Sequence, residues 1–201
     1  MKERKYECLQ AVVDGRHLYR IKALIDIPER GVKIGDLGGF IEHEGNLSHY
    51  GKAWIDGEAI VYDKAIVYDD AWVGGNTKVH GKARIYGDAE VYGEAEIWGQ
   101  ARIYGHAHIY DGVGVSQSAR VFGNALIWGN VRISGSAWVY EDVHVFGTAE
   151  IYDNAHVYGH AIIRDGAMIY GNAHVCGYSD VGSTQLFAYT FLCRGCATEY
   201  I

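Results

Sequence analysis

Apolar and polar residues follow a period of six along most of this chain. Residues 51–182 divide into 22 hexads without an insertion, and the fifth residue of every hexad is Ile or Val. The third residue is Ala in 17 of the hexads. Because residues two apart in an extended segment point to the same side, each hexad predicts a short strand with a small and a branched side chain facing inward.

The first residue of each hexad predicts where the chain turns. It is Gly in 15 hexads and Asp in five, and both residue types tolerate positive φ better than most. Three such corners close a triangle, so we expect one coil to take three hexads, or 18 residues. Successive coils would stack at about 4.8 Å through sheet hydrogen bonds. The pattern therefore predicts an all-β, triangular parallel β-solenoid of about seven coils.

The two ends of such a solenoid need caps, because open sheet edges polymerise. Residues 6–13 and 16–25 alternate around Asp14-Gly15, a two-residue hairpin signal. We expect residues 1–36 to form a β-hairpin cap and its connection, residues 37–182 the β-helix, and residues 183–201 a C-terminal cap with a strand over 186–192.

The hexad frame also extends backwards from residue 51. In this frame Ile41 and Leu47 fall at the inner third position, whereas His43 and His49 fall at the inner fifth. The segment therefore predicts degenerate first rungs.

This repeat resembles the hexapeptide-repeat, left-handed parallel β-helix proteins. More narrowly, Gly35-Asp-Leu-Gly-Gly-Phe-Ile-Glu-His-Glu-Gly-Asn-Leu-Ser-His49, followed by Gly-x-Ala-Trp-Ile, is similar to the entry segment of the YdcK-like group of enterobacterial genomes and phages. The resemblance implies a left-handed helix and a phage or prophage origin.

Charge and composition narrow the classes of partner. The chain has 18 Lys and Arg against 25 Asp and Glu, a formal charge of −7, which gives no general attraction to nucleic acid or anionic lipid. No apolar stretch approaches a membrane span, and four cysteines are too few for a disulfide framework. We expect a cytoplasmic protein without a cofactor and without a membrane or nucleic-acid partner.

Histidines are the candidates for catalysis. The best-known members of the resembling family are acyltransferases, which implies trimers with a catalytic His near an extruded loop, but no loop interrupts these hexads. Candidate general bases are His106 and His108, or His156 and His160, unless these are solvated outward side chains. The His spacing of five found in gamma-class carbonic anhydrases does not occur. An acyltransferase-like enzyme acting at a trimer interface is the alternative function.

A second candidate site lies near the C-terminus. Cys193 and Cys196 form a CxxC, and His174 and Cys176 face outward on the last full coil. Four such ligands can hold a structural zinc ion, but a lone CxxC also occurs as ordinary packing. We favour packing and expect no metal.

The outer surface carries the strongest candidate for partner binding. Residues 18 apart should stack, and one corner then carries a row of aromatic residues: Tyr68, Tyr86, Tyr104, Phe122, Tyr140 and Tyr158. Ring stacking would stiffen the rod, whereas an exposed aromatic stripe marks an interface with a partner or a second copy.

A charged row lies beside that corner, at the fourth position of the same hexads. It contains Arg84, Arg102, Arg120 and Trp138. Arginines about 4.8 Å apart repel one another unless an anion lies across them or glutamates on adjoining faces balance them. The glutamates in question are Glu90, Glu94, Glu96 and Glu150.

Together these patterns predict a non-catalytic binding rod. Its partner is a protein, or a second copy in a dimer or trimer, held by the aromatic and charged rows. Its expected role is to inhibit a host or defence component.

Overall fold

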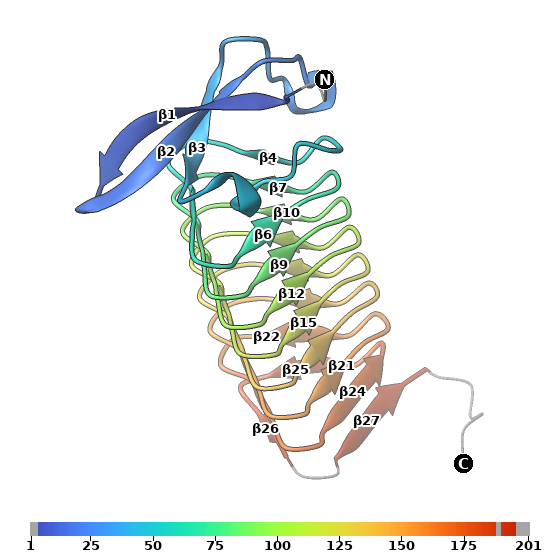
Figure 1. The fold of residues 1–201 in the computed structure, drawn as a ribbon. Helices are drawn as coiled ribbons and strands as arrows, with labels where there is room; N and C mark the ends of the chain where they lie inside the picture. Colours follow the sequence, from blue (N-terminus) through green and yellow to red (C-terminus); the bar gives the residue numbers. More distant parts are fainter. Residues whose placement is uncertain (1–3, 188–189, 196–201) are drawn as a thin grey trace.

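The chain folds as a parallel β-helix, as the hexads predict (Figure 1). The computed structural model describes residues 4–187 and 190–195. Short strands build three sheets along a rod of about eight coils, with 11, eight and eight strands. The N-terminal hairpin crosses one end of the rod, and the last strands form the other end. Among the described residues, no helix has the length and apolar character needed to cross a membrane.

Each of the three sheets runs along the rod, and its strands come from successive coils. In spatial order, the first sheet contains β1 (Tyr6–Val13), β2 (Arg16–Ala23), β3 (Leu37–Ile41), β5 (Ile60–Val61), β8 (Lys78–Val79), β11 (Glu96–Ile97), β14 (Gly114–Val115), β17 (Arg132–Ile133), β20 (Glu150–Ile151), β23 (Met168–Ile169) and β26 (Gln185–Leu186). The second contains β25 (Asp180–Gly182), β22 (Ile162–Arg164), β19 (His144–Val145), β16 (Leu126–Ile127), β13 (His108–Ile109), β10 (Glu90–Val91), β7 (Trp72–Val73) and β4 (Trp54–Ile55). The third contains β27 (Phe191–Arg194), β24 (His174–Gly177), β21 (His156–Val157), β18 (Trp138–Val139), β15 (Arg120–Val121), β12 (Arg102–Ile103), β9 (Arg84–Ile85) and β6 (Ile66–Val67).

The register of the coils follows the hexads. Within the repeat, parallel partners lie 18 residues apart, from Trp54 opposite Trp72 to Ile163 opposite Val181. The third and fifth residues of the hexads point inward, and none of them is more than 4% exposed. The interior is therefore a continuous column of small and branched side chains, which is why Ala and Ile or Val recur at these positions.

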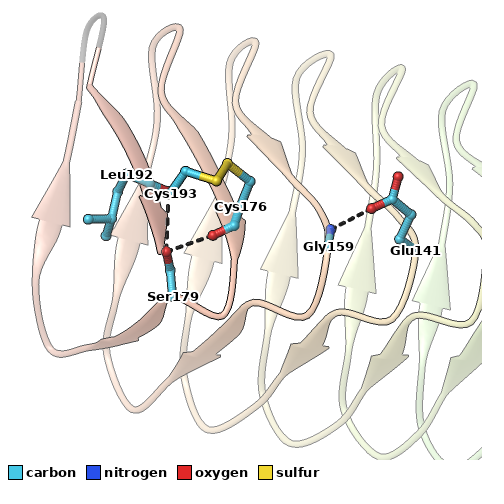
Figure 2. Close-up of a disulfide and its surroundings, with 6 residues drawn as sticks. All are labelled: Glu141, Gly159, Cys176, Ser179, Leu192 and Cys193. Atoms are coloured by element: carbon cyan, nitrogen blue, oxygen red, sulfur yellow. Dashed lines mark hydrogen bonds between the residues drawn. A yellow bond between two sulfur atoms is a disulfide. The ribbon is translucent and has the colours of Figure 1, made fainter. Parts of the chain in front are cut away.

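The corners of the triangle lie at the first residue of each hexad. All 22 of these residues have positive φ, including Gln117 and Glu141, which are not glycine. Most of the acidic corner residues gain a compensating contact, because the carboxylate accepts a hydrogen bond from the backbone N–H one coil later. Glu141 accepts from Gly159 N at 2.7 Å (Figure 2), and Asp63 accepts from Gly81 N at 3.1 Å. This contact explains why an acidic residue can replace Gly at a corner.

The N-terminal end contains the predicted hairpin and two short 3-10 helices. The strands β1 and β2 pair antiparallel around Asp14-Gly15, and β2 ends at Ala23. The helices are η1 (Pro28–Arg30) and η2 (Glu44–Asn46).

The predicted placement of the first rungs is wrong by two residues. Ile41 pairs with Val61 and Leu47 with Val67, both at the fifth position of a hexad rather than the third. His43 is exposed and caps η2 by accepting from Gly45 N, so it does not face inward. His49 is half-buried against the Tyr6 ring at 4.2 Å. The reason is η2, which replaces a normal corner and buries Asn46.

The C-terminal segment forms the last coil. The single strand expected over 186–192 is wrong: β26 ends at Leu186 and β27 begins at Phe191, and Phe187 and Thr190 between them are not in a strand. The strands β26 and β27 pair with β23 and β24, one residue short of the usual spacing, since Met168 lies opposite Gln185 and His174 opposite Phe191. This segment covers the last full coil with a further rung in the same sheets.

Candidate functional site

Between its corners, the third sheet presents outward side chains without carboxylates, although Asp63 and Asp153 lie exposed at the corners. In its seven hexads, which begin at residues 63, 81, 99, 117, 135, 153 and 171, the second, fourth and sixth residues point away from the core, and none of them is Asp or Glu. We call this surface the cationic face. Its basic residues are Lys64, Lys82, Arg84, Arg102 and Arg120. A face without carboxylates between its corners is unexpected in a chain with a net charge of −7.

The three arginines lie on adjacent strands in direct register. Arg102 is opposite Arg84 on one side and Arg120 on the other. Among the described residues, the ion pairs within 4.0 Å do not include any of these three arginines. Of the suggested glutamate partners, Glu90 pairs with Arg30 and Glu96 lies near His80. The three stacked arginines, which we call the arginine column, therefore keep their positive charge at the surface.

The same column becomes aromatic toward the C-terminal end. The Arg120 guanidinium lies 4.6 Å from the Trp138 ring centre, a cation–π contact. Trp138 stacks on His156 at 5.1 Å, and His156 stacks on His174 at 4.9 Å. Partial burial, and then the neighbouring His174, lower the pKa of His156. The lowered pKa favours the neutral form of His156, and the column has a cationic half and an aromatic half.

The six predicted aromatic residues form a continuous stack beside this column, which we call the aromatic ladder. Neighbouring ring centres are 4.7–5.2 Å apart, with planes within 7° of parallel. The rings are half-buried, and burial raises the pKa of Tyr104 and Tyr140. Phe122 meets Trp138 edge-on at 6.1 Å. The ladder and the column thus form one surface, and the ladder's role as an interface stays a prediction.

A disulfide continues the ladder at the C-terminal end. Cys176 and Cys193 follow Tyr158 at the same corner, lie opposite each other on β24 and β27, and are bonded (Figure 2). Their Cα atoms are 4.6 Å apart. The Ser179 hydroxyl donates to Cys176 O at 2.7 Å and to Leu192 O at 3.2 Å. The last rung is therefore fastened covalently and by a buried hydroxyl.

The four residues considered for zinc are not gathered into a site by the structure. Cys176 and Cys193 are bonded to each other, His174 stacks on His156, and Cys196 lies outside the described residues. Within the described part of the chain, no group of three or more His, Cys, Asp or Glu side chains could hold a metal ion. The sequence patterns do not predict this disulfide, because the register of β24 and β27, and not a sequence motif, brings the two cysteines together.

The candidate catalytic histidines lie on two different sheets. His108, on the second sheet, has Nδ1 3.2 Å from Glu90 Oε2 and 3.0 Å from the Tyr110 hydroxyl. His106 is exposed near Asp88, whereas His156 belongs to the third sheet. His160 stacks on Tyr178 at 4.9 Å.

A shallow groove of about 340 Å³ lies beside His106 and His108. Arg30 lines it, bonding Glu90 Oε1 at 2.6 Å and Asp70 O at 2.6 Å. Sequence reasoning did not find this contact, since Arg30 and Glu90 are 60 residues apart. Arg30 is engaged by these bonds, which fix the N-terminal cap on the rod.

No family model matches this chain, and no curated protein matches it. The resemblance to the hexapeptide-repeat proteins and their YdcK-like group therefore stays a prediction. A function for this chain has to be inferred from the surface of the rod itself.

Proposed function

We propose that this protein is a non-catalytic binding rod whose cationic face engages an acidic surface of a protein partner. The observation that carries the proposal is the arginine column, with three cations in direct register and no ion pair among the described residues. Cations about 4.8 Å apart repel one another. Carboxylates of a partner would relieve this repulsion and form charge-assisted, bidentate hydrogen bonds with the guanidinium groups.

The aromatic ladder favours a protein over a single-stranded nucleic acid. Nucleic-acid bases bind proteins by stacking on open aromatic faces, but the ladder rings already cover each other's faces at 4.7–5.2 Å. Their outer edges and the exposed part of Trp138, which already contacts Arg120 and His156, remain available for contact with apolar side chains. Aromatic and Arg residues grouped in this way are typical of protein-interface hot spots.

The biological setting is part of this proposal. A phage or prophage origin, and inhibition of a host or defence component, rest on the resemblance described above. A cytoplasmic location rests on the small number of cysteines, and the Cys176–Cys193 disulfide weighs against it because disulfides are rare in reducing compartments.

Removing the charges of the arginine column tests whether the cationic face binds an acidic partner. Replacing Arg84, Arg102 and Arg120 with Ser should lower the affinity of the rod for the acidic protein partner that it captures. The expected loss is at least about tenfold, which equals about 1.4 kcal/mol. The matched control replaces Lys33, Lys78 and Arg132, which are exposed and lie outside the cationic face, and changes the net charge equally. Affinity is measured by biolayer interferometry at low and high salt, with poly-glutamate as competitor. Equal loss in both variants would contradict the proposal.

The ladder is tested with paired aromatic substitutions. Tyr104→Ala with Phe122→Ala should abolish partner capture or self-association while the rod remains folded. The control is Tyr152→Ala with Tyr170→Ala, a stacked pair on the first sheet with ring centres 4.9 Å apart. Sedimentation velocity and partner capture are measured for both. If the ladder only stiffens the rod, each pair costs about 1–3 kcal/mol of stability and binding is unchanged.

A further inference from the structure

The spacing of the cationic face restricts the backbone of its partner. The face offers one column residue per coil, so Arg84, Arg102 and Arg120 span about 9.6 Å in two steps. A strand laid along the rod presents same-side residues every two positions, and two such steps cover about 13 Å. A helix presents one residue per turn, and two turns cover about 10.8 Å. The helix stays within about 1.2 Å of the arginine column, a difference that a flexible Arg side chain absorbs.

The composition of the column restricts the partner's side chains. Ile66 lies on the first coil, the next three coils carry Arg84, Arg102 and Arg120, and the coils after these carry Trp138 and His156. A partner helix on this column therefore needs acidic residues over two to three turns and apolar residues over the turns that follow. From Arg84 to His174 the column covers five coil steps, about 24 Å, which a helix of about 16 residues matches.

The borders of the column leave room for such a helix. On one side the ladder forms a ridge of half-buried rings. On the other side the outward residues after the corners are small or amide residues from the third coil of this sheet onward: Gln100, Ser118, Ser136, Asn154 and Asn172. They can donate hydrogen bonds to polar side chains and bring no carboxylate that would repel an acidic helix.

We propose that the partner of the cationic face is an amphipathic α-helix that lies along the rod axis, acidic in one half and apolar in the other. This inference rests on the proposed function, because it names the kind of protein segment that the cationic face binds. The acidic side chains recur at i, i+4 and i+7 and meet the arginine column. The apolar side chains follow on the same helical face and meet Trp138 and the ring edges beside it.

Two fluorescein-labelled peptides of 18 residues test the inference. Both have the same composition, with three Glu and three Leu in an Ala, Gln and Ser background. In the first, Glu and then Leu recur at helical spacing, and in the second they alternate at strand spacing. Fluorescence anisotropy at low salt should show at least tenfold tighter binding of the first peptide, with a gain of helical circular dichroism on binding. The Arg84→Ser, Arg102→Ser, Arg120→Ser variant should lose this binding, whereas the matched control variant should keep it.

The outcomes separate the two proposals. If both peptides bind with equal affinity and the arginine variant loses the binding of both, the helix inference is overturned and the acidic-partner proposal stands. If the binding of neither peptide is weakened in the arginine variant, the proposed function itself fails. A single-stranded oligonucleotide that binds the arginines more tightly than the helical peptide would overturn both.

Discussion

The two ends of the rod are finished by different chemistry. At the N-terminal end, side chains bond the backbone carbonyls that an earlier coil would have used. Lys5 Nζ donates to Ala53 O at 2.7 Å, and Asn46 Nδ2 donates to Ala65 O at 2.8 Å. At the C-terminal end, a further rung follows the last full coil, and the disulfide links it covalently to that coil. Phe187 and Phe191 in this segment are 56% and 67% exposed.

This difference shows two solutions to one problem. An exposed rung invites pairing with another chain, and the N-terminal end prevents it with groups that do not repeat and cannot be extended. The C-terminal end instead keeps the repeat geometry and fixes its last strand covalently. We therefore expect the N-terminal end to be sensitive to packing and the C-terminal end to redox conditions.

The largest difference should come from adding one methyl group at each end. A Cβ at Gly38 would collide with the backbone oxygen of Ile55 and lie 2.7 Å from Ile21 Cγ1. A Cβ at Gly182 would lie 3.0 Å from the flexible ends of Arg164 and Asp165. Gly38→Ala should cost about 3 kcal/mol, and Gly182→Ala less than about 0.5 kcal/mol. Urea unfolding followed by Trp fluorescence measures both, and similar losses would remove the contrast between the ends.

Breaking the disulfide should weaken one end only. Cys193→Ser opens a link between residues 17 apart, and loops of that size contribute about 2–3 kcal/mol. Hydrogen exchange should rise in β27, with no change in β3. Cys8→Ser, at the free and half-buried cysteine of the hairpin, is the control. Unchanged exchange in β27 would show that backbone pairing and Ser179 hold the last rung without the disulfide.

Alkaline pH should act on the N-terminal end. Burial lowers the pKa of Lys5 to about 8, against the usual 10.5, although Asp70 offsets part of the effect. Between these values the unfolded chain binds more protons, so the penalty for burying the ammonium is relieved as pH rises. From pH 8 to pH 9.5 the stability of wild type relative to Lys5→Met should rise by about 1–2 kcal/mol. A parallel pH dependence of the two proteins would exclude this role for Lys5.

Acid should act weakly on the C-terminal end. Because the pKa of His156 is lowered in the folded protein, the unfolded chain takes up its proton first as pH falls below about 6.5, and stability declines. Trp138 and His174 flank His156, and among the described residues no carboxylate contributes to the shift of its pKa. His156→Phe should remove a small part of the acid loss, because the ring is partly exposed and solvent screens its charge. Thermal melts at pH 5 and pH 7 measure it, and an equal acid loss in both proteins would contradict the assignment.

The repeat could be predicted almost completely from the sequence. The period fixes which residues point inward from Ile55 to Val181, since a single slip would place polar side chains in the core. It also fixes which residues stack, so the arginine column and the ladder lie where the 18-residue spacing puts them. The absence of ion pairs to the arginines among the described residues could not be predicted, because it depends on side-chain reach between faces.

The ends could not be predicted in the same way. Ile41 and Leu47 fit the hexad frame as sequence, but η2 shifts them by two residues, because Asn46 bonds the carbonyls of Asp63 and Ala65 and holds the chain in a tight turn. The Arg30–Glu90 contact and the disulfide also join segments that no local pattern relates. Long-range, non-repeating contacts decide both ends.

The uninterrupted hexad frame also sets the rotational phase of the rod. Adding 18 residues would lengthen it by about 4.8 Å and return every later side chain to its original sheet. Adding only six residues, for example after Arg102, would leave the interior satisfied but turn everything beyond it by one third of a circle. Arg120 and Trp138 would then face another direction from Arg84 and Arg102. A length change of whole hexads is therefore neutral for the core, but it disrupts the cationic face unless it comes in whole coils.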